Sequence, residues 1–397
     1  MTLITRAGKY VRQPQGYRAF IPARLPPDPP VTVDAAMLRL LSRADQALGR
    51  LDGIAQTLPN PNLFVAMYVN REAVFSSQIE GTQSTLDDVL EFQLGATVRD
   101  LPTDVEEVVN YIRAMNYGLQ RLETFPLSLR LIREIHAELL HGVRGQDRTP
   151  GEFRTTQNWI GAADSPLSRA AFVPPPVSEL NVVLGDFERF LHADHDLPIL
   201  LVCGLAHAQF ETIHPFLDGN GRVGRLLITF LLCQREVLHR PLLYLSYFLK
   251  RHRTEYYDRL MAIRDSGNWE GWLAFFLRGV AETAEEATQT VRAIVSIREQ
   301  HRSLLQEQHL GSNAVKLLDL LFEKPIINVG YAKEHMKVSF ATANKLIDQF
   351  VTLGLLHQIT PGPRKRVFRY APYLTLFDER APDDGESVPP QRTVSER

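Results

Sequence analysis

The 397-residue sequence contains only two cysteines, Cys203 and Cys233, and both lie within apolar stretches. Isolated cysteines in such surroundings are typical of small buried side chains rather than of disulfides or metal ligands. This sparse use of cysteine favours a protein of a reducing compartment.

Long apolar runs and a strong charge bias are also missing. No stretch reaches the roughly 18 consecutive apolar residues of a membrane span, and residues 1–24 lack the apolar core of a signal peptide. The formal net charge is only -2, which argues against binding to nucleic acid or anionic membranes through bulk charge. The sequence therefore predicts a soluble, cytoplasmic protein with no membrane partner.

What is present is a globular composition, with 44% hydrophobic and 23% charged residues, in a chain long enough for two or three domains. Apolar residues recur mostly at helical spacing, so the predicted fold class is mainly α. The expected helices cover residues 34–58, 62–80, 85–94, 104–121, 128–140, 198–210, 223–232 and 281–308. Residues 1–33, rich in proline, are expected to form an extended arm lying on the domain.

The residues with the most chemical potential lie together at 214–225, in the sequence HPFLDGNGRVGR between two apolar helices. The run Gly219-Asn220-Gly221 can turn successive backbone N–H groups into one concavity where a helix begins, and such a place favours an anion. Arg222 and Arg225 are three residues apart, so both can reach one polyphosphate from the same helix face. The segment predicts a phosphate cradle.

Three more side chains add chemistry to this cradle. Asp218 offers hard oxygen ligands for Mg²⁺ that is already bound to phosphates. His214 is placed to act as the base for an incoming hydroxyl, and Phe216 is predicted to anchor the loop in the core. Each feature alone is more often a simple turn, an ordinary histidine or a solvated helix face, and only their combination indicates a site.

Residues 214–225 match the HxFx(D/E)GNGRxxR motif without a mismatch, and the chain resembles the Fic family over roughly residues 1–280. The resemblance implies a Fic-type helical bundle with a β-hairpin flap that transfers AMP from ATP, with Mg²⁺, to a Ser, Thr or Tyr hydroxyl of a protein. It implies catalysis by His214 and metal binding by Asp218. The implied nucleotide-binding residues are Gly219, Asn220, Gly221, Arg222, Val223, Gly224 and Arg225. Relatives with lysine in place of the second glycine act as kinases, and Gly221 argues against that variant.

A second motif, SSQIEG at residues 76–81, stands at the end of the expected helix 62–80. Gly81 suits the position after a helix end, and spacing alone makes Glu80 an exposed residue of the last turn. The motif also resembles the inhibitory pattern (S/T)xxxE(G/N) of many Fic proteins, with Ser76, Glu80 and Gly81 as the matching residues. That resemblance implies that the Glu80 carboxylate pairs with Arg225 where the γ-phosphate of ATP would bind.

Two further elements surround the motif. Ser84 and Asp87 suggest a capping-box-like start for the helix 85–94. Residues 251–260 contain adjacent tyrosines that must face different ways on a helix, and the resemblance implies that Tyr257 and, as a weaker candidate, His252 contact adenine.

Residues 150–161, with a return strand at Phe172-Val173, have the composition of a β-hairpin. From the residues alone, this hairpin either is structural or offers an edge to an extended segment of a target protein. The resemblance implies a flap over the active site. Its expected docking residues are Thr155, Thr156, Gln157, Asn158, Trp159 and Ile160.

The C-terminal part has the element order of a winged helix-turn-helix, with helices at 313–323, 331–336 and 339–353 and a hairpin at 355–370. The hairpin turn carries Arg364, Lys365 and Arg366, and the third helix offers Asn344 and Lys345. These residues fit contact with DNA, and equally a docking or dimerisation module with a solvated basic loop. The tail 378–397 is expected to be disordered.

The predicted division is therefore an N-terminal arm with the inhibitory helix at 1–110, a catalytic core at 111–280, a linking helix at 281–310, a winged-helix domain at 311–377 and the tail. The favoured function is an autoinhibited protein adenylyltransferase that also modifies itself. A hydrolase removing AMP, with Glu80 orienting water, and a nucleotide-sensing DNA-binding regulator are the alternatives. The protein substrate is not identified, and a homodimer is left open.

Overall fold

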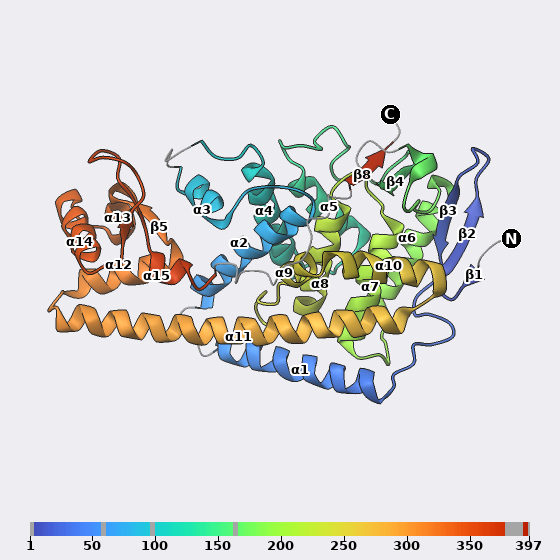
Figure 1. The fold of residues 1–397 in the computed structure, drawn as a ribbon, viewed down its shortest axis with the longest axis horizontal. Coiled ribbons are helices and arrows are strands. Elements are labelled where there is room, and N and C mark those ends of the chain that lie inside the picture. The colour runs from blue at the N-terminus through green and yellow to red at the C-terminus, as the bar shows by residue number, and fades with distance from the viewer. Residues whose placement is uncertain (1–3, 57–60, 96–99, 162–165, 378–391, 396–397) are drawn as a thin grey trace.

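The computed structural model describes residues 4–56, 61–95, 100–161, 166–377 and 392–395 (Figure 1). The described chain is mainly helical. Within it, no helix combines the length and the apolar character needed to cross a membrane.

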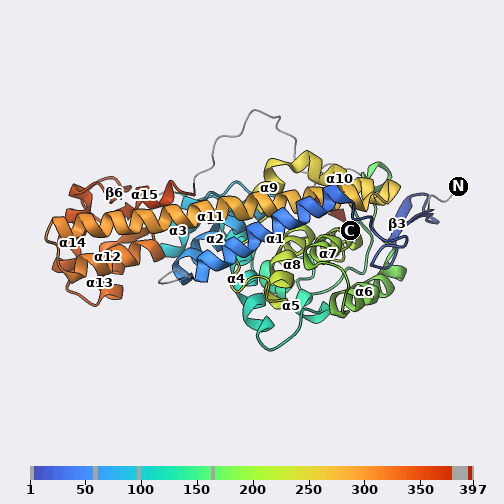
Figure 2. The same ribbon diagram turned by 90° about the horizontal axis from the view of Figure 1, so that it is seen from below.

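Two long helices that run in the same direction form one side of the molecule (Figure 1). Helix α11 (Trp269–Glu307) runs along the length of the protein, and α1 (Ala35–Gln56) lies beside it (Figures 1 and 2). The buried side chains of α1, among them Met37, Leu41, Ala44 and Leu48, recur three or four residues apart and face α11. Since α11 is continuous, it crosses the boundary that the sequence predicts at residue 280.

The core is built around α7 (Ile199–Ile213) and α8 (Asn220–Gln234), whose side chains are buried on nearly every side. Helices without a polar face need to be covered all round. The covering helices are α11, α2 (Pro61–Ile79), α4 (Val105–Leu122), α5 (Leu129–Leu139), α6 (Val177–His192) and α10 (Arg253–Ser266). Helix α9 (Ser246–Arg251) packs on α2. Residues 214–225 thus begin at the end of α7, within the buried core.

Helix α3 (Leu86–Leu94) begins at Leu86, one residue later than a cap at Ser84 would place its start. Thr85 is the N-cap: its hydroxyl accepts from the Asp88 backbone N–H at 3.3 Å, and the Asp88 carboxylate accepts from the Thr85 N–H at 2.8 Å. The capping box predicted at Ser84 and Asp87 is therefore wrong. Ser84 is instead held by a hydrogen bond to Asp104.

The N-terminal residues form a sheet, so the prediction of a simple extended arm is wrong for residues 4–22. Strands β1 (Ile4–Thr5), β2 (Gly8–Arg12) and β3 (Arg18–Pro22) pair antiparallel in that order. Phe20 on β3 is buried, and its ring packs against that of Phe172, with the ring centroids 6.2 Å apart. This contact anchors the sheet beside the flap.

The flap contains one strand, β4 (Asn158–Gly161), and its regular partner is β8 (Arg392–Ser395) near the C-terminus. Phe172 makes only an isolated bridge to Ile160. The predicted return of the chain at Phe172 is confirmed, because Phe172 pairs antiparallel with Ile160. The pairing does not extend into a hairpin ladder, because prolines 174–176 follow and have no N–H. The predicted disorder of the tail is wrong for residues 392–395, while 378–391 and 396–397 lie outside the described residues. A short 3-10 helix (Leu167–Arg169) precedes Phe172.

Residues 312–377, hereafter the C-terminal unit, lie at one end of the molecule beyond α3 (Figure 1). The unit contains α12 (Ser312–Glu323), β5 (Ile326–Asn328), α13 (Val329–Met336), α14 (Phe340–Thr352), β6 (His357–Gln358), β7 (Val367–Arg369) and α15 (Ala371–Leu374). Its antiparallel sheet has the order β5-β7-β6. Strand β5 was not predicted, because three residues are too few to show a period.

Candidate active site

Residues 214–219, hereafter the catalytic loop, connect α7 to α8. Helix α7 ends at His214 in the left-handed conformation (φ 49°, ψ 59°), and Gly219 precedes α8 with φ 78°. A left-handed backbone suits glycine but costs a residue with a Cβ about 1–2 kcal/mol. The surrounding contacts must therefore hold His214 in place.

The amide of Asn220 closes this loop. Its Oδ1 accepts from the Phe216 N–H and its Nδ2 donates to the Phe216 carbonyl, both at 2.8 Å. The Phe216 ring is fully buried, in the place expected of a core anchor. Because both amide atoms are used within the loop, the groups left to meet an anion are the first backbone N–H groups of α8.

Two side chains from the flap pin the catalytic loop from the other side. The His214 carbonyl accepts from Arg154 Nε at 3.1 Å and from Asn158 Nδ2 at 3.2 Å. Asn158 also donates to the Phe216 carbonyl at 2.8 Å. Asn158 was predicted to dock a target, but its side chain braces the loop. Arg154 was missed, since a contact over this sequence distance leaves no local pattern.

His136 on α5 supports the loop from below and was also missed. Its ring stacks on Phe216 with centroids 3.7 Å apart. Nδ1 accepts from the Gly151 N–H at 2.8 Å, so Nε2, 3.0 Å from the Asp218 carbonyl, is the donor. Burial lowers the pKa of His136 to about 4, which keeps the ring neutral in this role.

The His214 side chain is buried, and its protonation is tuned by its surroundings. Burial, followed by the positive charges of Arg154 and Arg264, lowers its pKa to about 3, against a hydrogen bond to the Glu211 backbone. At neutral pH the imidazole is therefore uncharged, and its low pKa makes it a weak proton acceptor; the negative charge of a phosphate beside the ring would raise this pKa.

The two arginines of the motif have different partners. Arg222 is buried, with Nη1 3.5 Å from a Glu107 carboxylate oxygen and Nη2 3.6 Å from Asp218 Oδ1. Arg225 instead points to α2, where its Nε donates to Ser76 Oγ at 2.8 Å and its Nη2 to the Ser76 carbonyl at 2.9 Å. Glu107 is a further site residue that the sequence did not indicate.

Glu80 completes the contacts of Arg225. Arg225 Nη2 donates to Glu80 Oε1 at 2.7 Å, and the side chains are 2% and 26% exposed respectively. A Cβ added at Gly221 would lie only 2.2 Å from that same Glu80 oxygen. The carboxylate therefore lies directly against the first turn of α8, over the expected anion cradle. Gly81, with φ 100°, lets the chain turn away after it.

Two more carboxyl groups approach Arg225, and neither was predicted. Burial raises the pKa of Glu72 and of Glu211 to about 7 each, and the charge of Arg225 opposes the shift in both. Glu72 accepts from the Tyr111 hydroxyl and the Ser246 N–H, each at 3.2 Å. Arg225 is thus fixed from several sides, and only Glu80 is partly open to solvent.

The two residues predicted to contact adenine, Tyr257 and His252, lie in different surroundings. Burial, and next the charge of Glu80, raise the pKa of Tyr257 to about 12, which places this ring near the Glu80–Arg225 pair. His252 packs on Phe248 at 4.5 Å and its pKa is lowered by burial and by Arg278 of α11. The neighbouring Tyr256 packs inward, with its hydroxyl 2.8 Å from His207.

The flap side chains divide into two groups. Thr155 and Thr156 are exposed and Ile160 is half-buried, whereas Gln157, Asn158 and Trp159 are buried. Ile160 uses its N–H and carbonyl with Phe172, at 2.8 and 3.1 Å. Along a strand, the backbone N–H and carbonyl groups of successive residues point to opposite edges. The backbone groups of Trp159 and Gly161 therefore point to the outer edge of β4, where they lie opposite Val394 and Arg392 of β8.

Comparison with known proteins agrees with this geometry. Residues 38–120 match the Fic/DOC family N-terminal model and residues 126–232 match the Fic/DOC family model. Over these two ranges the chain is similar to the Fic/DOC family.

Similar curated proteins are named protein adenylyltransferase Fic. The one from Culex quinquefasciatus is 29% identical over 187 residues, which cover 47% of this chain and 33% of that protein. The one from Drosophila virilis is 29% identical over 214 residues, covering 52% and 39%. The chain therefore spans well under half the length of these relatives.

A crystal structure of a Fic family protein from Desulfovibrio desulfuricans G20 has a similar fold, with a TM-score of 0.56 at 19% identity. The match covers 86% of this chain and 97% of that one.

Proposed function

We propose that this protein is an autoinhibited protein adenylyltransferase, which transfers AMP from ATP to a Ser, Thr or Tyr hydroxyl of a protein. The observation that carries the proposal is the Glu80 carboxylate, which accepts a hydrogen bond from Arg225 and lies against Gly221 at the start of α8. The names of the relatives support the same reaction.

In this reaction His214 takes the proton of the target hydroxyl as its oxygen attacks the α-phosphorus of ATP. A bond forms between that oxygen and phosphorus, the bond to the β-phosphate oxygen breaks, and pyrophosphate leaves. The first N–H groups of α8 and the guanidinium of Arg225 stabilise charge on the phosphates. Catalysis then consists mostly of positioning and charge stabilisation.

The residues present fit Mg²⁺ held jointly by protein and substrate. Asp218 offers a partly exposed carboxylate, one oxygen of which accepts from the Gly219 N–H at 2.6 Å. Mg²⁺ is typically held by one or two carboxylates together with substrate phosphates, and the single Asp218 carboxylate fits that arrangement. When bound there, the ion would neutralise charge on the departing pyrophosphate.

Inhibition follows from the position of Glu80. A carboxylate on Arg225 takes the guanidinium contact that a γ-phosphate needs, and its negative charge repels the nucleotide. ATP can then bind only in a pose in which its α-phosphorus is misplaced.

The test compares wild type, Glu80→Gly and Glu80→Gly/His214→Ala with ATP labelled on the α-phosphate and, in parallel, with ATP labelled on the γ-phosphate. Strong protein labelling by Glu80→Gly alone is expected. Label that arrives only from the γ-phosphate would overturn adenylyl transfer. Release of AMP from a modified target by wild type would instead favour the hydrolase.

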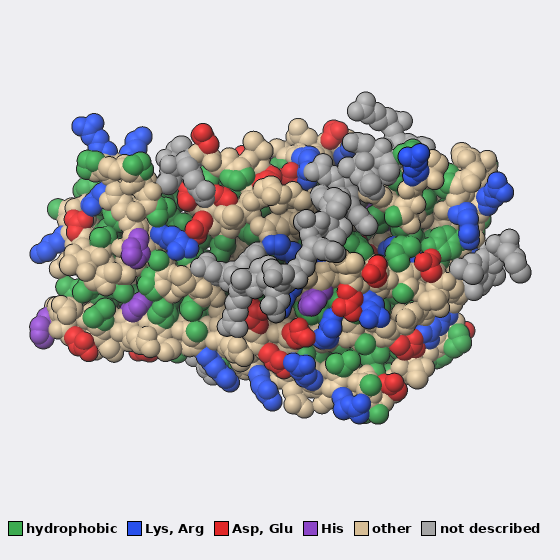
Figure 3. Space-filling model, viewed as in Figure 1, with side chains coloured by type: hydrophobic (Ala, Val, Ile, Leu, Met, Phe, Trp, Pro, Cys, Tyr) green, Lys and Arg blue, Asp and Glu red, His purple; other side chains and the backbone are tan. Residues whose placement is uncertain are grey.

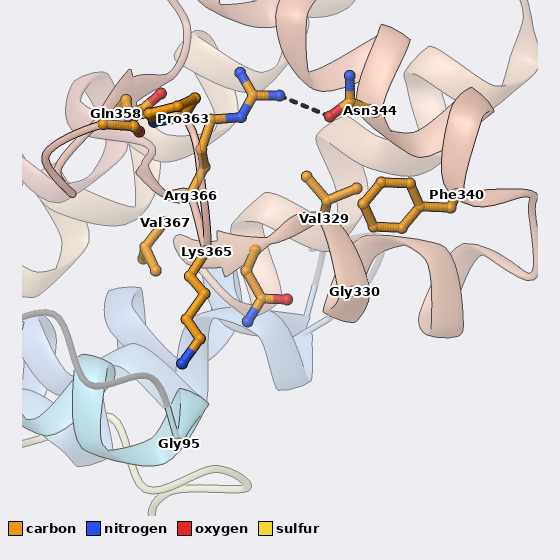
Figure 4. Close-up of a pocket in the computed structure, with 12 residues that line it drawn as sticks. Gly95, Val329, Gly330, Phe340, Asn344, Gln358, Pro363, Lys365, Arg366 and Val367 are labelled. Atoms are coloured by element: carbon orange, nitrogen blue, oxygen red, sulfur yellow. Dashed lines mark hydrogen bonds between the residues drawn. The ribbon is translucent and has the colours of Figure 1, made fainter.

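A second candidate function, DNA binding by the C-terminal unit as a winged helix, is favoured by one groove. A cavity of about 1040 Å³ lies between α14, the β6–β7 loop and the end of α3 at Gly95 (Figure 4). Figure 4 shows Lys365 reaching toward Gly95 and Arg366 bonded to Asn344, at 2.6 Å. Basic side chains gather at the outer edge of the unit (Figure 3).

Binding of the full chain to duplex DNA tests this function. Arg364, Lys365 and Lys345 are exposed, so Lys365→Ala is expected to weaken binding and to reduce its salt dependence by about one phosphate contact. Affinity that does not change with salt would contradict DNA binding.

A further inference from the structure

Residues 80–85, hereafter the inhibitory loop, connect the end of α2 to the start of α3. The loop is tied across its base: Gln78 Nε2 donates to the Ser84 carbonyl at 3.0 Å, and the Thr82 N–H donates to the Ser77 carbonyl at 3.2 Å. Lys250 of α9 donates to Gln78 Oε1 at 2.8 Å. Because both ends are tied together, the position of Glu80 depends on where α3 begins.

The first turn of α3 is held by the C-terminal unit. Arg369, at the end of β7, donates from Nε to Asp87 Oδ2 at 3.1 Å. Asp87 lies in the first turn of α3, two residues after its N-cap. Near the other end of the helix, Lys324 Nζ donates to Gln93 Oε1 at 3.1 Å. The C-terminal unit thus holds both ends of α3.

The same interface is loosely packed around Arg369. A cleft of about 290 Å³ separates the unit from α2 and α3, with Gln78, Asp87, Arg369 and Phe377 among its lining residues. The Arg369 and Asp87 side chains are 21% and 36% exposed. At this point the contact is therefore a partly solvated ion pair across a gap, which can be broken without removing core packing.

We propose that Arg369 and Asp87 are positioning residues for autoinhibition: the C-terminal unit holds Glu80 on Arg225 through the start of α3. The inference rests on the proposed adenylyl transfer and assigns the C-terminal unit a regulatory role in it. Breaking the ion pair lets α3 and the inhibitory loop shift, and Glu80 then leaves Arg225 more often.

The test measures AMP transfer by the full chain carrying Arg369→Ala or Asp87→Asn. A partly exposed ion pair contributes modestly, so each variant is expected to raise transfer about two- to fivefold. Arg43→Ala is the matched control, because Arg43 makes a partly exposed ion pair of the same kind with Glu285 at 2.7 Å, between α1 and α11. This control is expected to transfer AMP at the wild-type rate.

A second comparison separates positioning from general destabilisation. In the Glu80→Gly background, Arg369→Ala is expected to add nothing, because the contact it controls is already gone. The charge-swapped pair Asp87→Arg/Arg369→Asp is expected to return transfer toward wild type. An equal rise with and without Glu80, or no rise in either single variant, would overturn the inference.

The outcome for the proposed function is read separately. If Glu80→Gly itself transfers no AMP, adenylyl transfer fails. If Glu80→Gly labels strongly while Arg369→Ala behaves as wild type, only the regulatory role of the C-terminal unit fails.

Discussion

The catalytic loop leads into α8, which carries Arg225, and the inhibitory loop reaches Arg225 through Glu80. The two loops are held in opposite ways. The catalytic loop is buried apart from the partly exposed Leu217 and Asp218, and its carbonyl groups accept hydrogen bonds from α5, the flap and α8. Glu80 lies just past a helix end, 26% exposed, with its carboxylate on Arg225. Ser76 keeps two hydrogen bonds to Arg225 of its own. Glu80 can therefore leave without disturbing the arginine or the loop that performs the chemistry.

The largest expected effect on the rate of AMP transfer comes from a change in the catalytic loop. In the Glu80→Gly background, His214→Ala should lower AMP transfer about 10²–10⁴-fold, because the hydroxyl loses its proton acceptor. Initial rates with α-labelled ATP measure this loss, and an unchanged melting temperature shows that the loop still folds. A loss below tenfold would mean that His214 is not the base.

The next largest effect on the rate of AMP transfer comes from a change in the inhibitory loop. Glu80→Gly should raise transfer about 10- to 100-fold, since a charged hydrogen bond is worth about 1.5–3 kcal/mol. Glu80→Gln keeps the size but not the charge, so it should give a smaller rise. Equal rates for Glu80→Gln and wild type would show that shape, not charge, blocks the nucleotide.

Asn158→Ala sharpens the contrast between the two loops. The change removes two buried donors, to the carbonyls of His214 and Phe216, and should cost about 2 kcal/mol of stability. Transfer in the Glu80→Gly background should also fall, about tenfold, because the His214 ring loses its support. Urea unfolding and labelling rates check both. Glu80→Gly should lower the unfolding free energy by a similar amount, about 1.5–3 kcal/mol, because its charged hydrogen bond to Arg225 is lost, but its transfer rate should rise instead of fall.

Titration of Glu211 is expected to make the difference in unfolding free energy between wild type and Glu211→Gln depend on pH. Burial raises its pKa from the ordinary 4.5 to about 7, so the folded chain keeps a proton that the unfolded chain releases between these values. Wild type therefore loses stability relative to Glu211→Gln as pH rises through this window, by at most about 3 kcal/mol. Unfolding free energies near pH 5 and near pH 7.5 measure the change. A constant difference would contradict it.

The smallest expected effect concerns the flap. Strand β8 pairs with the outer edge of β4, so a target that adds there as a strand has to displace residues 392–395. Removing residues 392–397 in the Glu80→Gly background should lower the KM for a protein target about two- to fivefold, at unchanged KM for ATP. A change in the KM for ATP would show that the tail acts elsewhere.

The sequence allowed the contiguous features to be predicted. The helices follow from apolar periodicity, and residues 214–225 and 76–81 follow from motifs whose members are neighbours in the chain. The contacts of Arg154, His136 and Glu107 were not predictable, because each partner lies far along the chain and leaves no periodic pattern. The pairing of β4 with β8 was missed for the same reason, and the cap of α3 because Ser84 and Thr85 are both good cap residues.

Helix α11 has a consequence for how the protein folds. Its 39 residues span about 58 Å at 1.5 Å per residue, and one uninterrupted helix packs on α1, α7 and α12. The catalytic and C-terminal halves therefore share a structural element, and we expect them to unfold in one cooperative transition. A fragment ending at residue 280 would strand the buried side chains Ala44, Leu48 and Leu51 of α1 without their partner. Proteolytic dissection of this chain should accordingly yield few stable intermediates.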